Sequence, residues 1–346
     1  MGVRLPPPAF VRLFAGILIV PMLAACLPNS VTLQLGPSSS KLRPAVVMGE
    51  ERASASFALI DIRGMIADRP RQSLIGSSPS ILDTVVARLR QCEKDSGVRG
   101  VLLRVNSPGG SVAGSEALYR EVRAFRERTG KPVVVSMSEV AASGGYYVSL
   151  AGDEIVAEET TITASIGVIF PLVNVSEGLA KIGIYANHRT SGASKAMGDP
   201  LSPSDPAHDA IIQGLVDDMY TRFTRVVRER RPRIEASQWD RLTDGRVVTG
   251  ADAFASGLVD HLGGIEKAFE RLKVLAEVDD ARLVVYHSQP EGGFVPRTPY
   301  AEAEPVGSPG TEVSASVVGV SLSLPSGVVT LEPGRAYYAW PAGAAW

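Results

Sequence analysis

Short apolar runs alternate with segments of helical periodicity through the middle of the chain. The runs are four to six residues long and rich in Val, Ile and Leu, which is typical of buried strands. They lie at residues 57–62, 100–105, 132–137 and 154–157. Apolar side chains at helical spacing predict helices over residues 81–92 and 115–128. Strands that alternate with helices indicate an α/β fold, in which a mostly parallel sheet is flanked by helices.

The longest predicted helix spans residues 205–230 and ends in a run of arginines. One stripe of apolar residues follows it: Ile211, Ile212, Leu215, Val216, Met219, Phe223, Val226 and Val227. The basic residues at its end are Arg222, Arg225, Arg228, Arg230, Arg231 and Arg233. Because a basic last turn offsets the helix dipole, we expect a solvated face here, with anionic lipid or a neighbouring subunit as the alternative contact.

The N-terminal segment has the features of a targeting signal. Arg4 and Arg12 give it a basic start, and residues 13–25 form an apolar run that Pro21 interrupts. This run is shorter than the roughly 20 residues that a membrane-spanning helix needs. The segment therefore predicts export rather than a spanning helix.

Residues 23–26, Leu-Ala-Ala-Cys, resemble a bacterial lipobox, in which the cysteine becomes the lipid-modified first residue of the mature chain. We therefore expect residues 1–25 to be a lipoprotein-type signal peptide and Cys26 to be the lipid anchor. An uncleaved anchor and a simple secretion signal are the alternatives. Each places the rest of the chain on the extracytoplasmic face of a bacterial membrane, either periplasmic or at the cell surface.

Changes in composition divide the remaining chain. Residues 26–54 are rich in Ser, Pro and small residues, which predicts a flexible tether. Residues 55–288 carry the alternating strands and helices and form one predicted domain. In residues 289–346 Pro, Gly and Ser become frequent, which predicts a partly disordered tail. Within that tail, residues 313–331 are small and apolar; we expect one or two strands there, or docking in a groove of the domain by strand addition.

Composition narrows the class of protein. The 346 residues include 45% hydrophobic ones, enough for a sizeable core, and the net charge of −2 gives no global attraction to nucleic acid. Cys92 is the only cysteine besides Cys26, which excludes a disulfide framework from the mature chain. We expect Cys92 to be an apolar core residue rather than a reactive thiol.

Two segments carry the residues for covalent hydrolysis. Ser143 lies in Ala-Ala-Ser-Gly-Gly-Tyr-Tyr (141–147), where two glycines clear the backbone after the hydroxyl, and Lys195 lies in Ser-Gly-Ala-Ser-Lys (191–195). A serine hydroxyl needs a base before it can attack a carbonyl, and a desolvated lysine amine can be that base. The pair predicts a serine-lysine hydrolase.

The lysine must lose its charge to act as a base. Lowering its pKa from about 10.4 to about 7 disfavours the ammonium form by roughly 4–5 kcal/mol. Burial in an apolar site has this effect, and we expect the walls around Lys195 to come from Ile166, Val168, Ile169 and Phe170.

A glycine loop is a candidate oxyanion hole. Asn-Ser-Pro-Gly-Gly (106–110) follows a predicted strand and opens a predicted helix, an arrangement that leaves backbone N–H groups at a surface. Gly144 would present a further N–H group next to Ser143 without a side chain in the way. Taken alone, the loop fits an ordinary strand-to-helix turn equally well.

Five segments occur in the order found in the SppA signal peptide peptidase family, and the chain resembles the shorter form of that family, which has a single catalytic domain. They are Asn106–Gly110, Ala141–Tyr147, Thr163–Ile169, Ser191–Lys195 and Asp244–Gly264. The resemblance spans residues 57–287. It implies a ClpP/crotonase-like ββα spiral, peptide substrates such as signal peptides, no cofactor, and homo-oligomeric rings or domes with interior active sites.

The resemblance also implies roles for individual residues. Ser143 matches the nucleophile and Lys195 the general base, while Ser165 matches the serine that orients the lysine amine. Gly109 and Gly144 match the positions whose N–H groups form the oxyanion hole. The implied function is a membrane-tethered serine endopeptidase that degrades signal peptides or other membrane-associated peptides after their release.

Other chemistries fit the sequence less well. Ser143 is not in a Gly-x-Ser-x-Gly turn, which weighs against a Ser-His-Asp triad, and we expect His188 to be a partly exposed structural residue. No His-Glu-x-x-His or comparable spacing predicts a metal site. Two interpretations stay open: a crotonase-like acyl-CoA hydrolase or hydratase on the same fold, and a non-catalytic lipoprotein scaffold in membrane quality control.

Overall fold

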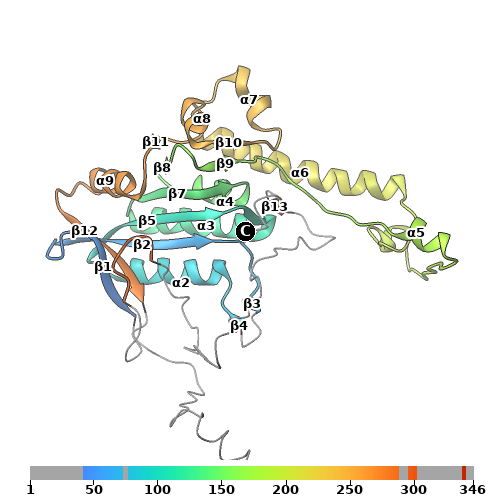
Figure 1. Cartoon of the computed structure of the whole chain (residues 1–346), viewed down its shortest axis with the longest axis horizontal. Coiled ribbons are helices and arrows are strands. Elements are labelled where there is room, and N and C mark those ends of the chain that lie inside the picture. The colour runs from blue at the N-terminus through green and yellow to red at the C-terminus, as the bar shows by residue number, and fades with distance from the viewer. Residues whose placement is uncertain (1–41, 73–76, 288–294, 302–336, 340–346) are drawn as a thin grey trace, which may run out of the picture. The chain divides into compact units, whose positions relative to one another are not determined.

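A mostly parallel sheet organises the described part of the chain (Figure 1). The computed structural model describes residues 42–72, 77–287, 295–301 and 337–339. The sheet strands are β1 (Arg43–Gly49), β2 (Ala55–Arg63), β5 (Val98–Ser107), β7 (Val133–Ala142), β8 (Glu154–Ala157), β9 (Ile162–Ala164), β10 (Val247–Thr249), β11 (His261–Leu262) and β12 (Ala281–His287). Within the described residues their order is β1-β12-β2-β5-β7-β8-β11, with β9 beside β7 and β10 beside β9. The pairs β1–β12 and β9–β10 are antiparallel and the others are parallel, which confirms the predicted α/β class.

The remaining elements are helices and two small strand pairs. The helices are α2 (Ile81–Lys94), α3 (Val112–Thr129), α4 (Gly144–Ser149), α5 (Ser176–Lys181), α6 (Pro206–Arg230), α7 (Ala236–Leu242), α8 (Gly250–Ala255) and α9 (Ile265–Leu275), with a 3₁₀ turn η1 (Ala193–Ala196). The strand pairs join β3 (Arg71–Gln72) to β4 (Ser77–Ser78) and β6 (Gly109–Ser111) to β13 (Tyr337–Ala339). Among the helices of the described ranges, none has the length and apolar character that a bilayer span requires.

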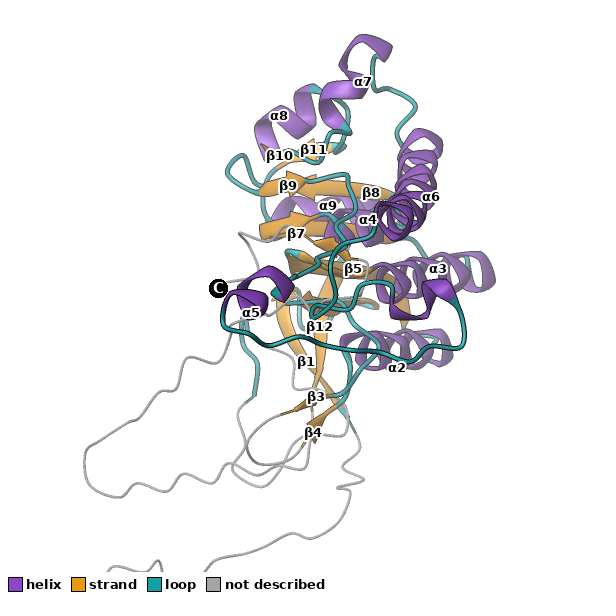
Figure 2. Cartoon of the chain, turned by 90° about the vertical axis from the view of Figure 1, so that its right-hand side faces the viewer, coloured by secondary structure: helices purple, strands orange, loops and turns teal. Residues whose placement is uncertain are grey.

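Alternate residues of the central strands pack against opposite layers of helices. In β5, Val101, Leu103 and Val105 belong to one apolar cluster, whereas Leu102 belongs to the other. The first cluster is completed by α2, α3, α4 and the end of α6, which Figure 2 shows along one side of the sheet, and the second by α9. A strand covered on both faces needs apolar residues at almost every position, which explains the apolar runs in the sequence.

Capping residues fix where the helices around the sheet begin and end. Ser80 Oγ accepts a hydrogen bond from Asp83 N (3.0 Å) at the start of α2, and Ser111 Oγ accepts one from Gly114 N (3.2 Å) at the start of α3. Gly130 ends α3 with a φ of 64°, a left-handed conformation that favours glycine. The glycine loop before α3 is thereby held at the carboxyl end of β5.

The predicted domain boundary at residue 55 is wrong. β1 begins at Arg43, inside the predicted tether of residues 26–54, and pairs with β12 at an edge of the sheet. Its partner lies at the other end of the domain sequence, so local composition alone gave no sign of the pairing. The lipobox at Cys26 and the tail segment 313–331 lie outside the described residues.

The apolar stripe predicted on α6 is buried only in part. Phe223 and Val227 are fully buried, but Ile211 and Leu215, toward the start of the helix, are 44% and 41% exposed. This half of α6 continues a segment, residues 171–215, that we call the arm; its short helix α5 has no buried residue (Figure 1). Ile212, in the same half of the stripe, is buried, so the described residues of one chain cover this half only in part.

The solvated face expected for the arginines at the end of α6 is also wrong in part. Arg230 donates to the carbonyls of Leu150 (2.9 Å) and Gly152 (2.7 Å), next to the end of α4. Arg231 is buried and forms an ion pair with Asp260 at 2.8 Å. These arginines fasten the C-terminal half of α6 to the domain, because a guanidinium group can satisfy several oxygens at once.

Cys92 is fully buried in α2, which confirms that it is a core residue. Burial raises the pKa of its thiol to about 12.

Because the thiolate is the reactive form, we expect iodoacetamide at mildly alkaline pH to leave Cys92 unmodified in the native protein. Unfolding returns the pKa to about 8.5, so Cys92 should react in guanidinium chloride. Mass spectrometry of the peptide that contains Cys92 measures the extent of modification in the native and in the unfolded protein. Equal modification in these two states would contradict the burial of Cys92.

Candidate active site

Ser143 lies at the sharp turn between β7 and α4. Its backbone has φ 51° and ψ −110°, and a strained conformation of this kind costs about 1–3 kcal/mol. Ser143 N donates a hydrogen bond to Ala164 O at 2.7 Å, and Tyr147 N donates one to Ser143 O at 2.8 Å. Such strain persists only where the surrounding bonds impose it, and it is concentrated at functional sites.

The hydroxyl of Ser143 is buried without a hydrogen-bond partner among the described residues. A buried unpaired hydroxyl costs about 1–3 kcal/mol, so the fold gains no stability from it. Ser115 Oγ, in α3, is likewise buried and makes no hydrogen bond within the described ranges. The site therefore holds two buried hydroxyl groups, those of Ser115 and Ser143, that form no hydrogen bond with the described residues.

Glycines allow three backbone segments to meet beside Ser143. A Cβ atom at Gly144 would lie 2.4 Å from Ser115 Oγ and 2.9 Å from Gly110 N. A Cβ atom at Gly110 would lie 1.9 Å from the carbonyl oxygen of Ile66. Neither position has room for a side chain, so the N–H groups of the glycine loop come close to the residue that follows Ser143.

Gly110 is a candidate for the oxyanion hole besides the predicted Gly109. Gly109 N donates to Ser107 Oγ at 3.2 Å, so this N–H group is already engaged. Gly110 N is the one that approaches Gly144. Gly110 was not predicted as an oxyanion-hole residue, although it directly follows Gly109 in the motif Asn-Ser-Pro-Gly-Gly.

Ser165 lies at the same edge of the sheet as Ser143. β9 runs parallel to β7 with Ala164 opposite Ala142, so each serine directly follows a paired residue. Ser165 is nearly buried, has a φ of 52°, and its Oγ donates to the Gly245 carbonyl at 3.3 Å. The fold thus brings Ser165 toward the turn at Ser143, but among the described residues it does not bring Ser165 into contact with Lys195.

Lys195 lies outside this cluster in a single chain. It is on η1 in the arm, its side chain is exposed, and its Nζ makes no hydrogen bond or ion pair with the described part of the chain. Ile166 and residues 168–170, the expected apolar walls, therefore do not bury it. Within the described part of one copy, Lys195 therefore lacks the apolar surroundings that were expected for it.

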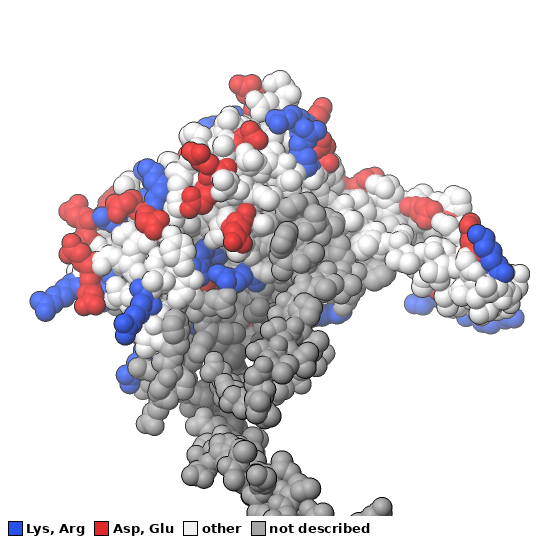
Figure 3. Space-filling model, in the orientation of Figure 1, with Lys and Arg blue, Asp and Glu red and all other residues white. Residues whose placement is uncertain are grey.

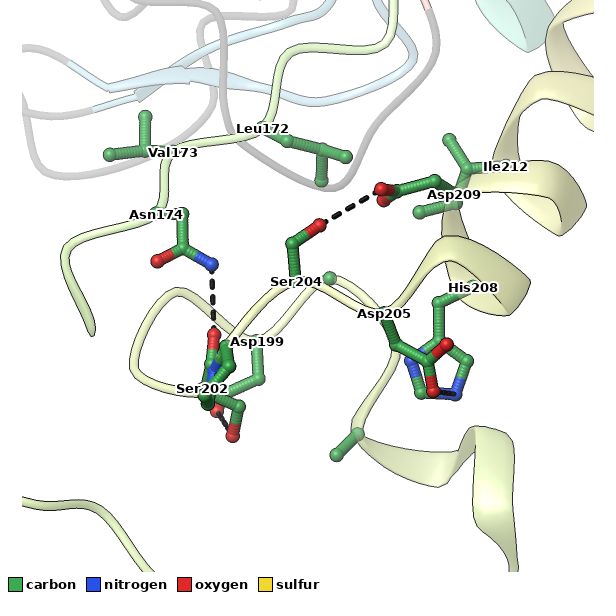
Figure 4. Close-up of a pocket in the computed structure, with 13 residues that line it drawn as sticks. Leu172, Val173, Asn174, Asp199, Ser202, Ser204, Asp205, His208, Asp209 and Ile212 are labelled. Carbon is green, nitrogen blue, oxygen red and sulfur yellow. Dashed lines mark hydrogen bonds and ion pairs between the residues drawn. The ribbon is translucent and has the colours of Figure 1, made fainter. Parts of the chain in front are cut away.

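Polar contacts within the arm hold the segment that follows the turn η1. Figure 4 shows Asn174 Nδ2 donating to the Ser202 carbonyl and Ser204 Oγ donating to Asp209. His208 Nε2, from α6, contacts Ala193 O of η1 at 3.1 Å. His188 is 40% exposed, as expected, and its Nε2 lies 2.8 Å from Asp199 Oδ2. A hydrogen bond from Ser202 Oγ and the nearby His188 hold the pKa of Asp199 below its ordinary value. In the described ranges no three His, Cys, Asp or Glu side chains are grouped to hold a metal ion.

Comparisons with known proteins identify the family. The model of peptidase family S49 matches residues 125–279, a range that contains Ser143, Ser165 and Lys195. A protein of Enterococcus faecium named "Putative signal peptide peptidase SppA" is 34% identical over 70% of this chain and 70% of its own length. "Protease 4" of Haemophilus influenzae is 36% identical over 63% of this chain, and "Serine protease SPPA, chloroplastic" of Arabidopsis thaliana is 31% identical over 58%.

The last two relatives are longer proteins, and the chain covers only 34% and 29% of their lengths. The Enterococcus protein, by contrast, is matched over most of its length, as expected for the form with a single catalytic domain. The mostly parallel sheet flanked by helices agrees with the fold that the resemblance implied. The chain therefore belongs to the SppA-type signal peptide peptidases of peptidase family S49, and it is a serine protease.

Proposed function

We propose that the chain is a membrane-tethered endopeptidase in which Ser143 and Lys195 form the catalytic dyad, and that it degrades signal peptides or other membrane-associated peptides after their release. The observation that carries this proposal is the setting of Ser143. Its hydroxyl is buried in a strained turn without a hydrogen-bond partner among the described residues, and it lies beside glycine N–H groups and the paired strand β13. A nucleophile, an oxyanion site and a bound extended chain are what a serine peptidase requires.

The reaction follows from these groups. Lys195 Nζ takes the proton of Ser143 Oγ as that oxygen attacks the scissile carbonyl carbon, and glycine N–H groups stabilise the oxyanion. The C–N bond breaks, and the lysine ammonium returns the proton to the leaving amine. The amine of Lys195 then deprotonates a water molecule, which attacks the ester, and the Ser143 oxygen leaves with the proton. Ser165 orients the lysine amine through its hydroxyl.

The lysine reaches the serine from a neighbouring copy of the chain. In one copy Lys195 is exposed and Ser143 Oγ has no partner among the described residues. The arm that carries Lys195 also exposes many large apolar side chains: Leu172, Val173, Val175, Ile182, Ile184, Tyr185, Leu201, Ile211 and Leu215. Figure 3 shows uncharged surface over much of the arm, with charged side chains gathered toward its tip.

A surface of this kind is typical of a contact between proteins, because exposed apolar groups gain free energy when they are covered. Packing the arm on a second copy would bury both its apolar residues and Lys195, and burial is what lowers the pKa of a lysine. Repeating the contact around a closed ring gives the homo-oligomer that the SppA resemblance implies. Subunit assembly then completes the catalytic site.

Anchoring at the membrane follows from the lipobox at residues 23–26. Acylation of Cys26 would hold the catalytic domain at the extracytoplasmic face, where released signal peptides remain in or near the bilayer. The chemistry of the substrate agrees with this placement, since a signal peptide is an apolar, unfolded segment that can bind as a strand.

The shared dyad predicts complementation between two inactive variants. We expect Ser143→Ala and Lys195→Ala each to abolish peptide hydrolysis. Co-assembled in equal amounts, they should regain about one quarter of wild-type activity, because one site in four then combines an intact serine with an intact lysine from its neighbour. Hydrolysis of a fluorogenic peptide by the purified co-assembled protein measures this.

Lys181→Ala, which removes an exposed lysine of the same arm, is the matched control and should keep wild-type activity. Mixed oligomers that form but stay inactive would place both dyad residues in one chain. Substantial activity of either single variant would remove its residue from the dyad.

Lipid anchoring predicts a modified N-terminus. We expect mass spectrometry of the detergent-extracted protein to find a chain that begins at Cys26 and carries acyl groups. Cys26→Ser should carry none, whereas Cys92→Ser, which alters the buried cysteine, should be acylated like the wild type. An unmodified Cys26 in the membrane fraction would contradict the anchor without affecting the dyad.

A further inference from the structure

A hollow of about 360 Å³, which we call the arginine hollow, lies between α3 and α6, two helices that Figure 2 shows on the same side of the sheet. Its charged lining consists of Arg120, Arg123, Arg222 and Arg225 together with Glu116 and Glu127. Four arginines and two glutamates give this lining a net charge of +2, in a chain whose net charge is −2. The electrostatic potential of the hollow therefore favours an anion.

The spacing of the arginines along each helix brings them to the hollow. Arg120 and Arg123 are three residues apart on α3, so they share one face of that helix. Arg222 and Arg225 have the same spacing on α6. Like charges three residues apart repel each other and destabilise a helix. An anion bound between the two pairs would offset this repulsion.

The two glutamates neutralise only half of the arginines. Arg222 forms an ion pair with Glu116 at 2.6 Å, which joins α6 to α3. Arg123 forms one with Glu127 at 2.8 Å, one turn further along α3. These ion pairs hold two guanidinium groups in place and leave the other two to be accounted for.

Arg120 and Arg225 are the two arginines without such a partner. Both are exposed, and neither forms a hydrogen bond or ion pair with the described part of the chain. A guanidinium group presents its N–H donors in a planar fork that matches two oxygens of a phosphate group. The hollow therefore keeps two cationic groups available for a ligand of this chemistry.

Tyr119 is a second and independent indication of a ligand. Its side chain lines the hollow and is 7% exposed, and its hydroxyl is buried without a hydrogen-bond partner among the described residues. The Arg123 guanidinium lies over its ring, 5.9 Å from the centroid. Because phosphate oxygens can accept hydrogen bonds from a phenol and from guanidinium groups at once, this pair suits the same ligand.

We propose that the arginine hollow is a binding site for a phosphate group, carried by an anionic phospholipid or by a soluble phosphate compound. A lipid source agrees with the anchor expected at Cys26, since stable attachment to a membrane combines an acyl chain with a basic contact. The inference goes beyond the proposed function, because none of these residues takes part in the proposed reaction.

Chemical footprinting tests the site in the full chain. The wild-type protein is reconstituted in vesicles of phosphatidylcholine alone, or of equal parts of phosphatidylcholine and phosphatidylglycerol. Phenylglyoxal is added, and mass spectrometry follows the modification of each arginine. We expect phosphatidylglycerol to slow the modification of Arg120 and Arg225 about tenfold, since a bound phosphate covers their guanidinium groups. Arg241, an exposed arginine of α7, is the control and should react equally in both vesicles.

Inorganic phosphate added to the phosphatidylcholine vesicles separates the two sources. Protection of Arg120 and Arg225 by phosphatidylglycerol alone would support a lipid headgroup, and equal protection by inorganic phosphate would support a soluble ligand. The absence of protection in both conditions would overturn the proposal. Equal slowing at Arg241 would also overturn it, because the effect would then be general to the surface.

A paired variant tests whether the two unpaired arginines hold the ligand. Arg120→Gln combined with Arg225→Gln should abolish the protection of Arg222 by the probe that protects it in the wild type. The charge-matched control, Arg90→Gln combined with Arg241→Gln, removes two exposed arginines elsewhere and should keep that protection. Equal loss of protection in both variants would make net charge the cause and overturn the site.

Two further measurements complete the test. Tyr119→Phe retains the ring and removes only the hydroxyl, so we expect it to fold and to bind the protecting probe about threefold more weakly. The alternative occupant of the hollow is a neighbouring copy of the chain. If Arg120→Gln with Arg225→Gln lost its oligomeric state in detergent, measured by light scattering, the hollow would be a contact between copies and the proposal would be overturned.

Discussion

The backbone turn at Ser143 is the constraint on which the rest of the site depends. A serine at φ 51° is disfavoured, and here the parallel pairing of β7 with β9 holds it there through the bond from Ser143 N to Ala164 O. The same pairing carries Ser165 to the edge where Ser143 stands. Strain that the sheet imposes on one residue therefore sets the positions of two serines at once.

The glycines around this turn impose a second constraint on the geometry of the site. At Gly110 and Gly144 a Cβ atom would meet backbone or hydroxyl atoms at 2.4 Å or less, so the loop after β5 and the start of α4 can touch only because both positions lack a side chain. That close approach leaves a strand edge at β6 beside Ser143. β13 pairs with that edge through its backbone, which is the mode in which an extended peptide binds to a sheet edge.

Much of this arrangement could be predicted from the sequence. Apolar runs located β2, β5, β7 and β8, helical spacing located α2, α3 and α6, and the glycine motifs located the turn at Ser143. Local patterns failed where the partner is remote: β1 needs β12, and β13 needs β6. They also failed at Arg231, whose ion pair with Asp260 cannot be seen from the charge pattern of one helix.

Lys195 shows a different limit of prediction from the sequence. Its sequence motif predicted a buried base, but one copy of the chain leaves Lys195 exposed on an arm with apolar residues that nothing in the described chain covers. A sequence motif does not tell whether two residues meet within a chain or between chains. Under the proposed function, the exposed arm and the Ser143 hydroxyl, which has no partner among the described residues, have one explanation: packing on a second copy would desolvate Lys195.

The central claim is that Lys195 activates Ser143 for attack, and covalent labelling tests it most directly. The detergent-purified protein would be treated with a fluorophosphonate probe and its peptides analysed by mass spectrometry, with Lys195→Ala treated in parallel. Our account predicts that the probe modifies Ser143 in the wild type and that the modification disappears in Lys195→Ala. Equal modification of Ser143 in both proteins would mean that another group activates the serine, and would contradict the account.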